Sequence, residues 1–294
     1  MKTSIFALSV FTTALVSASP SGPRSDYAWS PALAGYYQKV ALHIQEAKEA
    51  GAPSACDLAG AAPPPAPTPL PTPDGLILAH VVVGRGVQNY TCAESSPDVK
   101  PVAAGALANL YNASCMAASF PDLLALMPDL ALQYPLSNPG IANPEGDADA
   151  STLLSSYTNL QPSDIALSGH HFFSNKTPVF ELNSSPDGAA RSLGIIQGKA
   201  NANSTAPAGS CPGVDWKGDG AVPWLFLDAT PNSQTTDIRF DGVNPQAPAG
   251  TEEWKHVYRV NTAGGSPPKT CEGIEAGAEF SVQYAANYWY YKGP

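Results

Sequence analysis

The stretch from Glu279 to Tyr291 constrains the fold of this chain more than any other part of the sequence. Apolar and aromatic side chains occupy every second position there, namely Phe280, Val282, Tyr284, Ala286, Tyr288 and Tyr290. A period of two is typical of a β-strand with a buried face, and aromatic side chains favour a pleated surface. The stretch Trp254–Val260 reads as a second strand, joined to the first by a long turn. We expect the core to be built around this pair.

Short apolar runs separated by turn residues continue this pattern through residues 76–83, 87–92, 177–182 and 221–228. Gly84 and Gly86 interrupt the first two runs, which predicts a bulge or turn there. The runs have strand length, and no regular alternation of strands with helices is visible. The sequence therefore predicts a mainly β fold, a single-domain β-sandwich or barrel in residues 74–294.

Three segments precede this domain. Residues 1–18 have the charge, apolar run and small residues before the cut that define a signal peptide. Residues 19–60 form an N-terminal helical segment, in which Ser30 caps a helix that begins at Pro31, packs on the domain's sheet and ends near Gly51. Residues 61–73 are rich in proline and form an extended connector, either a spacer or a segment laid across the surface.

The signal peptide predicts a secreted, extracellular protein without membrane insertion, because the apolar run is shorter than the ~20 residues that span a bilayer. The formal net charge is −10, from 15 basic and 25 acidic side chains. Such a surface repels nucleic acid and anionic lipid, so we expect neither as a partner.

Five cysteines favour disulfide bonds in an oxidising compartment and leave one cysteine over. Cys92 and Cys115 are nearest in sequence and are the first choice for a pair, whereas the partners of Cys56, Cys211 and Cys271 stay open. Five sequons predict a glycoprotein. Asn175, Asn183 and Asn203 lie in polar, turn-like contexts and are the expected glycosylation sites; Asn89 and Asn112 complete the set.

Several stretches form one ordered series. They are Gly84–Cys92, Gly169–Phe173, Val222–Leu225, Arg259–Gly265 and Val282–Tyr291. The series resembles a domain-of-unknown-function family of secreted fungal proteins with bacterial relatives, whose fungal members often carry the label malate dehydrogenase. The resemblance covers Cys56–Tyr291, implies a secreted single-domain protein and brings no catalytic residues with it.

A malate dehydrogenase activity does not agree with the residues. In the stretch Gly84–Asn89, an asparagine stands where a dinucleotide fingerprint needs its third glycine. The residues that follow favour a strand instead of the helix that such a fingerprint opens. We therefore expect no dehydrogenase.

His170 and His171 are the candidates for a catalytic or metal site. Adjacent residues on a strand point to opposite faces, so one metal ion is not held by both. A copper or zinc site needs one of them with His80, His256 or a carboxylate. The alternative is one hydrogen-bonded core histidine and one surface histidine, without a cofactor.

The candidate ligand-binding surface lies on the second face of the C-terminal strand. Gln283, Asn287, Trp289 and Tyr291 share that face and form a polar and aromatic patch suited to sugars. The function predicted first is a non-catalytic extracellular protein that binds cell-wall or host-surface glycans. The alternative is an extracellular enzyme, either a histidine-ligated metal oxidase or a hydrolase.

Overall fold

The structure is a computed structural model that describes residues 30–51, 56–134, 159–184, 191–213, 219–235 and 253–293. The signal peptide expected at residues 1–18 lies outside these ranges. The helices are α1 (Pro31–Ala50), α2 (Ser114–Ser119), α3 (Pro121–Leu124) and α4 (Met127–Gln133). The strands are β1 (Ile77–Thr91), β2 (Val102–Asn112), β3 (Leu167–Ser174), β4 (Thr177–Ser184), β5 (Arg191–Ser204), β6 (Trp224–Ala229), β7 (Gln234–Thr235), β8 (Glu253–Gly264) and β9 (Glu279–Gly293).

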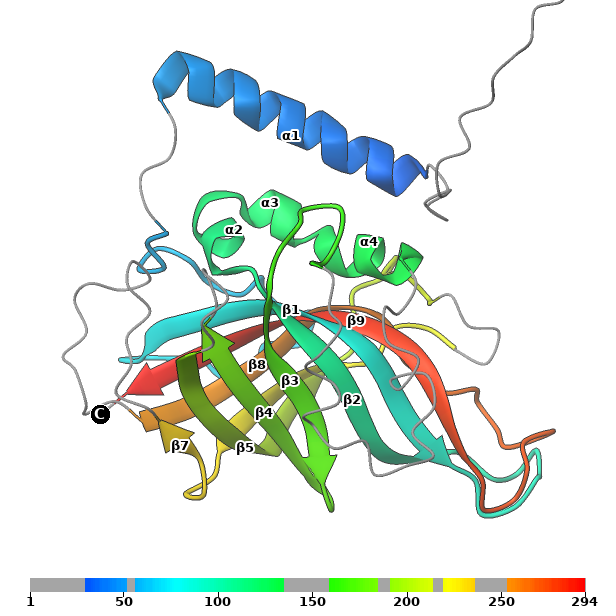
Figure 1. Cartoon of the computed structure of the whole chain (residues 1–294). Helices are drawn as coiled ribbons and strands as arrows, with labels where there is room; N and C mark the ends of the chain where they lie inside the picture. The colour runs from blue at the N-terminus through cyan, green and yellow to red at the C-terminus, as the bar shows by residue number, and fades with distance from the viewer. Residues whose placement is uncertain are drawn as a thin grey trace, which may run out of the picture.

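Eight of the strands close into an antiparallel β-barrel (Figure 1). Their order is β4-β3-β2-β1-β9-β8-β6-β5, and pairing of β4 with β5 closes the circle, while the short β7 pairs with β5 outside it. β9 lies between β1 and β8, with fourteen paired positions along β1. The prediction of a mainly β fold is confirmed, and the architecture is the barrel.

The two faces of β9 serve two different cores. Tyr284, Tyr288 and Tyr290 face the barrel interior, where they pack with Val82, Phe180 and other inward residues. Trp289 and Tyr291 face outward and pack in a second core beneath helices. Strand β9 is thus buried on both sides and not on one face alone, as its period of two had suggested, and almost no part of it is exposed.

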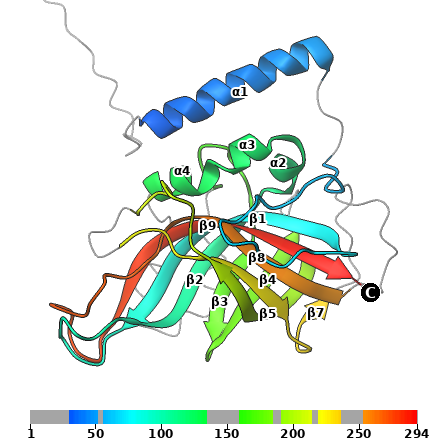
Figure 2. The ribbon, with the colours of Figure 1, turned by 180° about the vertical axis from the view of Figure 1, so that it is seen from behind.

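A helical layer covers the outer face of β1 and β9. Helices α2, α3 and α4 lie directly over these strands, and α1 lies outermost, across the other helices (Figures 1 and 2). The helix expected at Pro31 is present, and the Oγ of Ser30 accepts a 3.1 Å hydrogen bond from the amide of Leu33. Helix α1 does not pack on the sheet as predicted, because α3 and α4 already occupy that surface.

The proline-rich residues 61–73 are laid across the outside of the barrel. The amide of Thr68 donates to the Oγ of Ser204 at 2.9 Å, and the Tyr258 hydroxyl donates to the carbonyl of Pro71 at 2.8 Å. Leu70 packs against the outer core. Because the segment makes these contacts in an extended form, it acts as part of the outer wall.

The disulfide predicted between Cys92 and Cys115 is wrong. Cys56 pairs with Cys115, with Cα atoms 4.5 Å apart, and Cys92 pairs with Cys271, with Cα atoms 5.8 Å apart. Cys92 follows β1 and Cys115 follows β2, and the 11 residues of β2 place them roughly 35 Å apart along the barrel. Cys211 is the unpaired cysteine.

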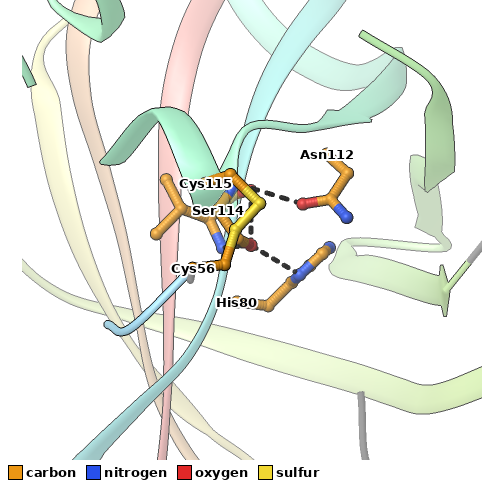
Figure 3. The surroundings of a disulfide bond; sticks show 6 residues. Cys56, His80, Asn112, Ser114 and Cys115 are labelled. Carbon is orange, nitrogen blue, oxygen red and sulfur yellow. Dashed lines mark hydrogen bonds between the residues drawn. A yellow bond between two sulfur atoms is a disulfide. The ribbon is translucent and has the colours of Figure 1, made fainter. Parts of the chain in front are cut away.

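The Cys56–Cys115 bond joins the segment that follows α1 to the first turn of α2 (Figure 3). Next to it, the Ser114 hydroxyl lies 3.1 Å from Nδ1 of His80, and the Ser114 amide donates to the side chain of Asn112. These contacts fasten α2 to the start of β1.

The glycines in β1 do not interrupt it. Strand β1 runs from Ile77 to Thr91 without a bulge at Gly84 or Gly86, contrary to the predicted break. A Cβ atom on Gly86 would lie 2.0 Å from the carbonyl oxygen of Leu107. The glycine therefore permits close approach of β1 and β2, and no helix follows it as a dinucleotide site would need.

Candidate functional site

A cavity of about 430 Å³ enters the barrel between the β3–β4 hairpin and strands β5 and β6. Its opening lies where strand β5 changes its pairing partner. Residues of β5 up to Gln197 pair with β4, and residues from Gly198 onward pair with β6. Pro178 directly precedes Val179, the first β4 residue that pairs with β5, and has no amide hydrogen to extend that ladder. The gap in the barrel wall therefore lies where Pro178 and Gly198 line the cavity.

The inner end of the cavity is aromatic. The rings of His171 and Phe180 stack with centroids 4.2 Å apart, and Tyr288 lies 5.5 Å from Phe180 and 5.9 Å from His171. All three side chains are buried, whereas Lys176 and Lys199 at the rim are exposed. Leu225 and Leu227 complete an apolar wall. This combination of an apolar body and a few polar groups is typical of small-molecule sites.

The charged residues that line the cavity are all cationic. They are Lys176, Lys199 and Arg259, and the described lining contains no carboxylate. The chain as a whole carries a formal net charge of −10. The cavity is thus a local positive region in an acidic protein, which favours anions there.

Two buried side chains in the cavity wall keep donors without partners. Arg259 is 8% exposed and Gln88 is 9% exposed. Within the described part of the chain, Nε of Arg259 and Nε2 of Gln88 have no hydrogen-bond acceptor. Arg259 does donate through Nη2 to the carbonyl of Pro223 at 2.8 Å. Buried polar groups are usually satisfied, so these two need an explanation.

His171 faces this cavity as a neutral imidazole. Burial, together with the weaker effect of the nearby Arg259 charge, lowers the pKa of His171 to about 4, although the hydrogen bond to the Val179 carbonyl acts in the opposite direction. Nδ1 lies 2.8 Å from the carbonyl oxygen of Val179, so it carries the proton. Burial also raises the pKa of Tyr288, while Arg259 acts in the opposite direction.

His170 and His171 lie on opposite faces of β3, as their adjacency predicts. His170 faces outward and its Nδ1 lies 3.2 Å from Oδ1 of Asn109. Both histidines are buried, so neither is the surface histidine of the alternative that we considered. Among the described residues, no group of three or more His, Cys, Asp or Glu side chains is placed to hold a metal ion.

The glycan-binding patch expected on β9 is not accessible. Asn287, Trp289 and Tyr291 are 0%, 2% and 4% exposed. The side-chain Nδ2 of Asn287 donates to the carbonyl of Leu124 at 3.0 Å, and Trp289 packs beneath the helices. Gln283 accepts a hydrogen bond from Arg85. The face predicted to be open is the surface on which α2–α4 pack. A strand face that carries two large aromatic side chains is stabilised when another layer of the fold buries it.

The family described as protein of unknown function (DUF3455) matches residues 73–292. The chain belongs to this DUF3455 family. A second match, to the domain of unknown function DUF2990, covers residues 10–71. Neither a curated protein nor a solved structure matches the chain.

The DUF3455 match spans all residues that line the cavity, from Gln88 to Tyr288. It also contains both halves of the Cys92–Cys271 bond. The Cys56–Cys115 bond joins the two matched regions, since Cys56 lies in the DUF2990 part. No described helix is both long and apolar enough to cross a membrane.

Two expected glycosylation sites in this DUF3455 chain are exposed. Asn175 lies at the tip of the β3–β4 hairpin with φ at +56°, and Asn203 lies on β5. Asn183 lies in β4, and its side chain is outside the described part. Among the other sequons, Asn89 is buried in β1.

The sequence reading missed Arg259 and Gln88. The available signal for Arg259 was a charged residue between the apolar residues Tyr258 and Val260 of a predicted strand, whereas Gln88 is followed by the polar Asn89 and gave no such signal. Val257 and Arg259 point into the barrel, two positions apart, as strand alternation requires.

Proposed function

We propose that the protein is an exported, non-catalytic binding protein whose barrel holds a small, largely apolar ligand. The observation that supports this proposal best is the cavity of about 430 Å³ with an aromatic inner end and an exposed rim. Its volume lies in the range of roughly 300–1,000 Å³ that small-molecule sites occupy.

We propose export on the basis of the signal pattern in residues 1–18 and the two disulfide bonds. We also propose a fungal origin, as the sequence resemblance implies, and glycans at Asn175, Asn183 and Asn203. In a yeast host, the mature protein should appear in the medium with its N-terminus after Ala18. Replacement of each asparagine by glutamine should remove one endoglycosidase-sensitive glycan.

Binding of a small ligand is tested with the neutral fluorescent probe N-phenylnaphthylamine. The probe should bind to the secreted protein with increased emission, because the cavity walls are apolar. Ala200→Trp should abolish binding, since Ala200 lines the rim and is exposed, so a large ring fills the entrance without entering the core. Val102→Trp is the matched control on an exposed position of β2 outside the cavity. Equal binding by the Ala200→Trp variant would refute the cavity as the site.

Cell-wall and host-surface glycans, the partners expected from the sequence, enter the same assay as soluble oligosaccharides. The enzyme alternative is tested by metal analysis of the secreted protein before and after chelation. If the protein contains one copper or zinc ion per chain and a His171→Ala variant loses it, the binding proposal is refuted in favour of a metal enzyme.

A further inference from the structure

The inner wall of the cavity contains a buried cation without an anionic partner. Arg259 forms no ion pair with any carboxylate of the described residues, although its side chain is more than nine-tenths buried. Taking a charge out of water is costly unless hydrogen bonds and an opposite charge compensate it. The carbonyl of Pro223 accepts a hydrogen bond from one guanidinium nitrogen, and Arg259 also forms a side-chain hydrogen bond with Tyr288, whereas Nε has no acceptor in the described part of the chain.

Gln88 reaches the same cavity from β1, on the other side of β9 from Arg259. In the ladders, Gln88 pairs with Val282, and Arg259 pairs with Tyr288. The side-chain amide nitrogen of Gln88, Nε2, also has no acceptor among the described residues. Two donors from different strands thus border one cavity, and a ligand with acceptor oxygens would use both.

The remaining polar groups at the inner end do not oppose an anion. Tyr288 and His171 are uncharged in the folded protein, since burial raises the pKa of Tyr288 and lowers that of His171 to about 4. Lys176 and Lys199 at the rim add positive charge along the entry path. Beside the low-dielectric walls of a cavity, such charges attract an anion more strongly than they would in bulk solvent.

We propose that the ligand is an amphipathic molecule with a terminal oxyanion, whose charged group meets Arg259 and Gln88 while its apolar body lies along the aromatic and leucine walls. This inference rests on the proposed binding function and names the class of ligand. A carboxylate and a phosphate monoester share the required chemistry, because both present acceptor oxygens to a guanidinium group.

The experiment measures displacement of bound N-phenylnaphthylamine from the full secreted protein by three ligands with the same alkyl chain: decanoate, decyl phosphate and decanol. We expect at least one of the two anions to displace the probe at a concentration about tenfold lower than decanol. The anion that binds more tightly identifies the head group as carboxylate or phosphate. Equal potency of decanol and both anions would overturn the inference.

Variants connect the preference to the two donors. Arg259→Gln should weaken binding of the preferred anion by roughly tenfold to a hundredfold and leave decanol unchanged, because a charge-assisted hydrogen bond is lost. Gln88→Met is the second variant, should Arg259→Gln fail to fold, since Nε2 of Gln88 makes no bond that the fold would lose. It should weaken anion binding by roughly threefold to tenfold. Lys100→Gln, on an exposed lysine outside the cavity, controls for the change in net charge.

The outcomes separate the two proposals. Failure of the neutral probe to bind refutes the proposed function and this inference with it. Probe binding without a preference for the anions refutes only the inference. An anion preference that persists unchanged in every Arg259 and Gln88 variant that folds also refutes it.

Discussion

The Nε of Arg85 in β1 donates a 2.9 Å hydrogen bond to the carbonyl oxygen of Ala131 in the last turn of α4. Another nitrogen of the same guanidinium donates to the carbonyl of Tyr134 at 3.2 Å. Carbonyl groups at a helix C-terminus have no partner within the helix, and a cation is favourable there. This buried arginine therefore attaches the helical layer to the outer face of the barrel.

Replacing Arg85 by methionine should lower the free energy of unfolding by roughly 2–4 kcal/mol, because buried carbonyl groups lose charge-assisted hydrogen bonds. Urea denaturation of the two proteins measures the difference. Lys100→Met removes an exposed charge and should change stability by less than about 0.5 kcal/mol. Similar values for both variants would contradict the role of Arg85.

The attachment of α1 should depend on pH. His43 of α1 lies 2.9 Å from Asp122 of α3, and Lys39 lies 3.0 Å from the same carboxylate. The hydrogen bond to Asp122 raises the pKa of His43 above 6.5. Burial raises the pKa of Asp122, but hydrogen bonds from Lys39 and His43 outweigh this and lower it below 3.8.

The protonated His43 therefore stabilises docking fully below its unfolded pKa of 6.5, and this contribution is lost as pH rises through the raised pKa. The contribution of Asp122 is present above 3.8 and is lost as pH falls through the lowered pKa. Protection factors for amide hydrogen exchange in residues 31–50, which correct for the intrinsic pH dependence of exchange, should be highest between these limits. His43→Gln should remove the fall in protection at alkaline pH, with Gln45→Ala on the same helix as a control.

Acid should destabilise the barrel through three buried histidines. Burial lowers the pKa of His80 to about 3 and the pKa values of His170 and His171 to about 4. In the unfolded chain, these histidines bind protons as the pH falls below about 6.5. In the folded chain, they stay neutral until the pH reaches their lowered pKa values. Stability is thus full above 6.5 and falls as pH decreases.

Each of these histidines should lower the free energy of unfolding by up to about 1.4 kcal/mol per pH unit between pH 6 and 4. Urea midpoints at pH 7 and pH 5 test this. A His171→Gln variant should show a smaller difference between the two, while His43→Gln should not. If stability stays constant over this interval, the histidines are not held neutral by burial.

The observed cysteine pairs predict a specific fragment pattern. Peptide mapping without reduction should give Cys56–Cys115 and Cys92–Cys271 peptides, and denatured protein should contain one free thiol, that of Cys211. Loop-closure entropy gives roughly 4 kcal/mol for the 59-residue separation and roughly 5 for the 179-residue separation. Cys271→Ser should therefore destabilise the protein at least as much as Cys56→Ser. A Cys92–Cys115 peptide would contradict the fold.

Two glycine-to-alanine substitutions should act in opposite directions. On Gly86, the added Cβ would lie 2.0 Å from a backbone oxygen of β2, so Gly86→Ala should cost more than about 3 kcal/mol or prevent folding. On Gly35, in the interior of α1, no atom lies within 4 Å of the added Cβ, so Gly35→Ala should stabilise by up to about 1 kcal/mol. Thermal unfolding compares them directly. A neutral effect at Gly86 would place β1 and β2 further apart.

Local patterns predicted much of the secondary structure. Alternation in β9 placed Tyr284, Tyr288 and Tyr290 on one face and Trp289 and Tyr291 on the other, and this division is observed. Ser30, Pro31 and Gly51 predicted both ends of α1. These features are recoverable because strand alternation and helix capping depend on residues a few positions apart.

Apart from His171, the residues of the candidate site were not predicted, because they come from strands that meet only when the barrel closes. Arg259 on β8 and Gln88 on β1 are far apart in the chain, and β9 lies between their strands. The sequence pattern pointed instead to Trp289 and Tyr291, which a helical layer covers. Whether a strand face is open or covered depends on which segments pack on it.

The sequence by itself thus determined a β fold, its N-terminal helix and the two faces of its C-terminal strand, since these follow from local periodicity and capping. Only the tertiary structure decided the cysteine pairs, the burial of the predicted patch and the position of the cavity. These depend on contacts between distant residues, whose free energy is set by packing and burial across the closed barrel and is not encoded in any single stretch.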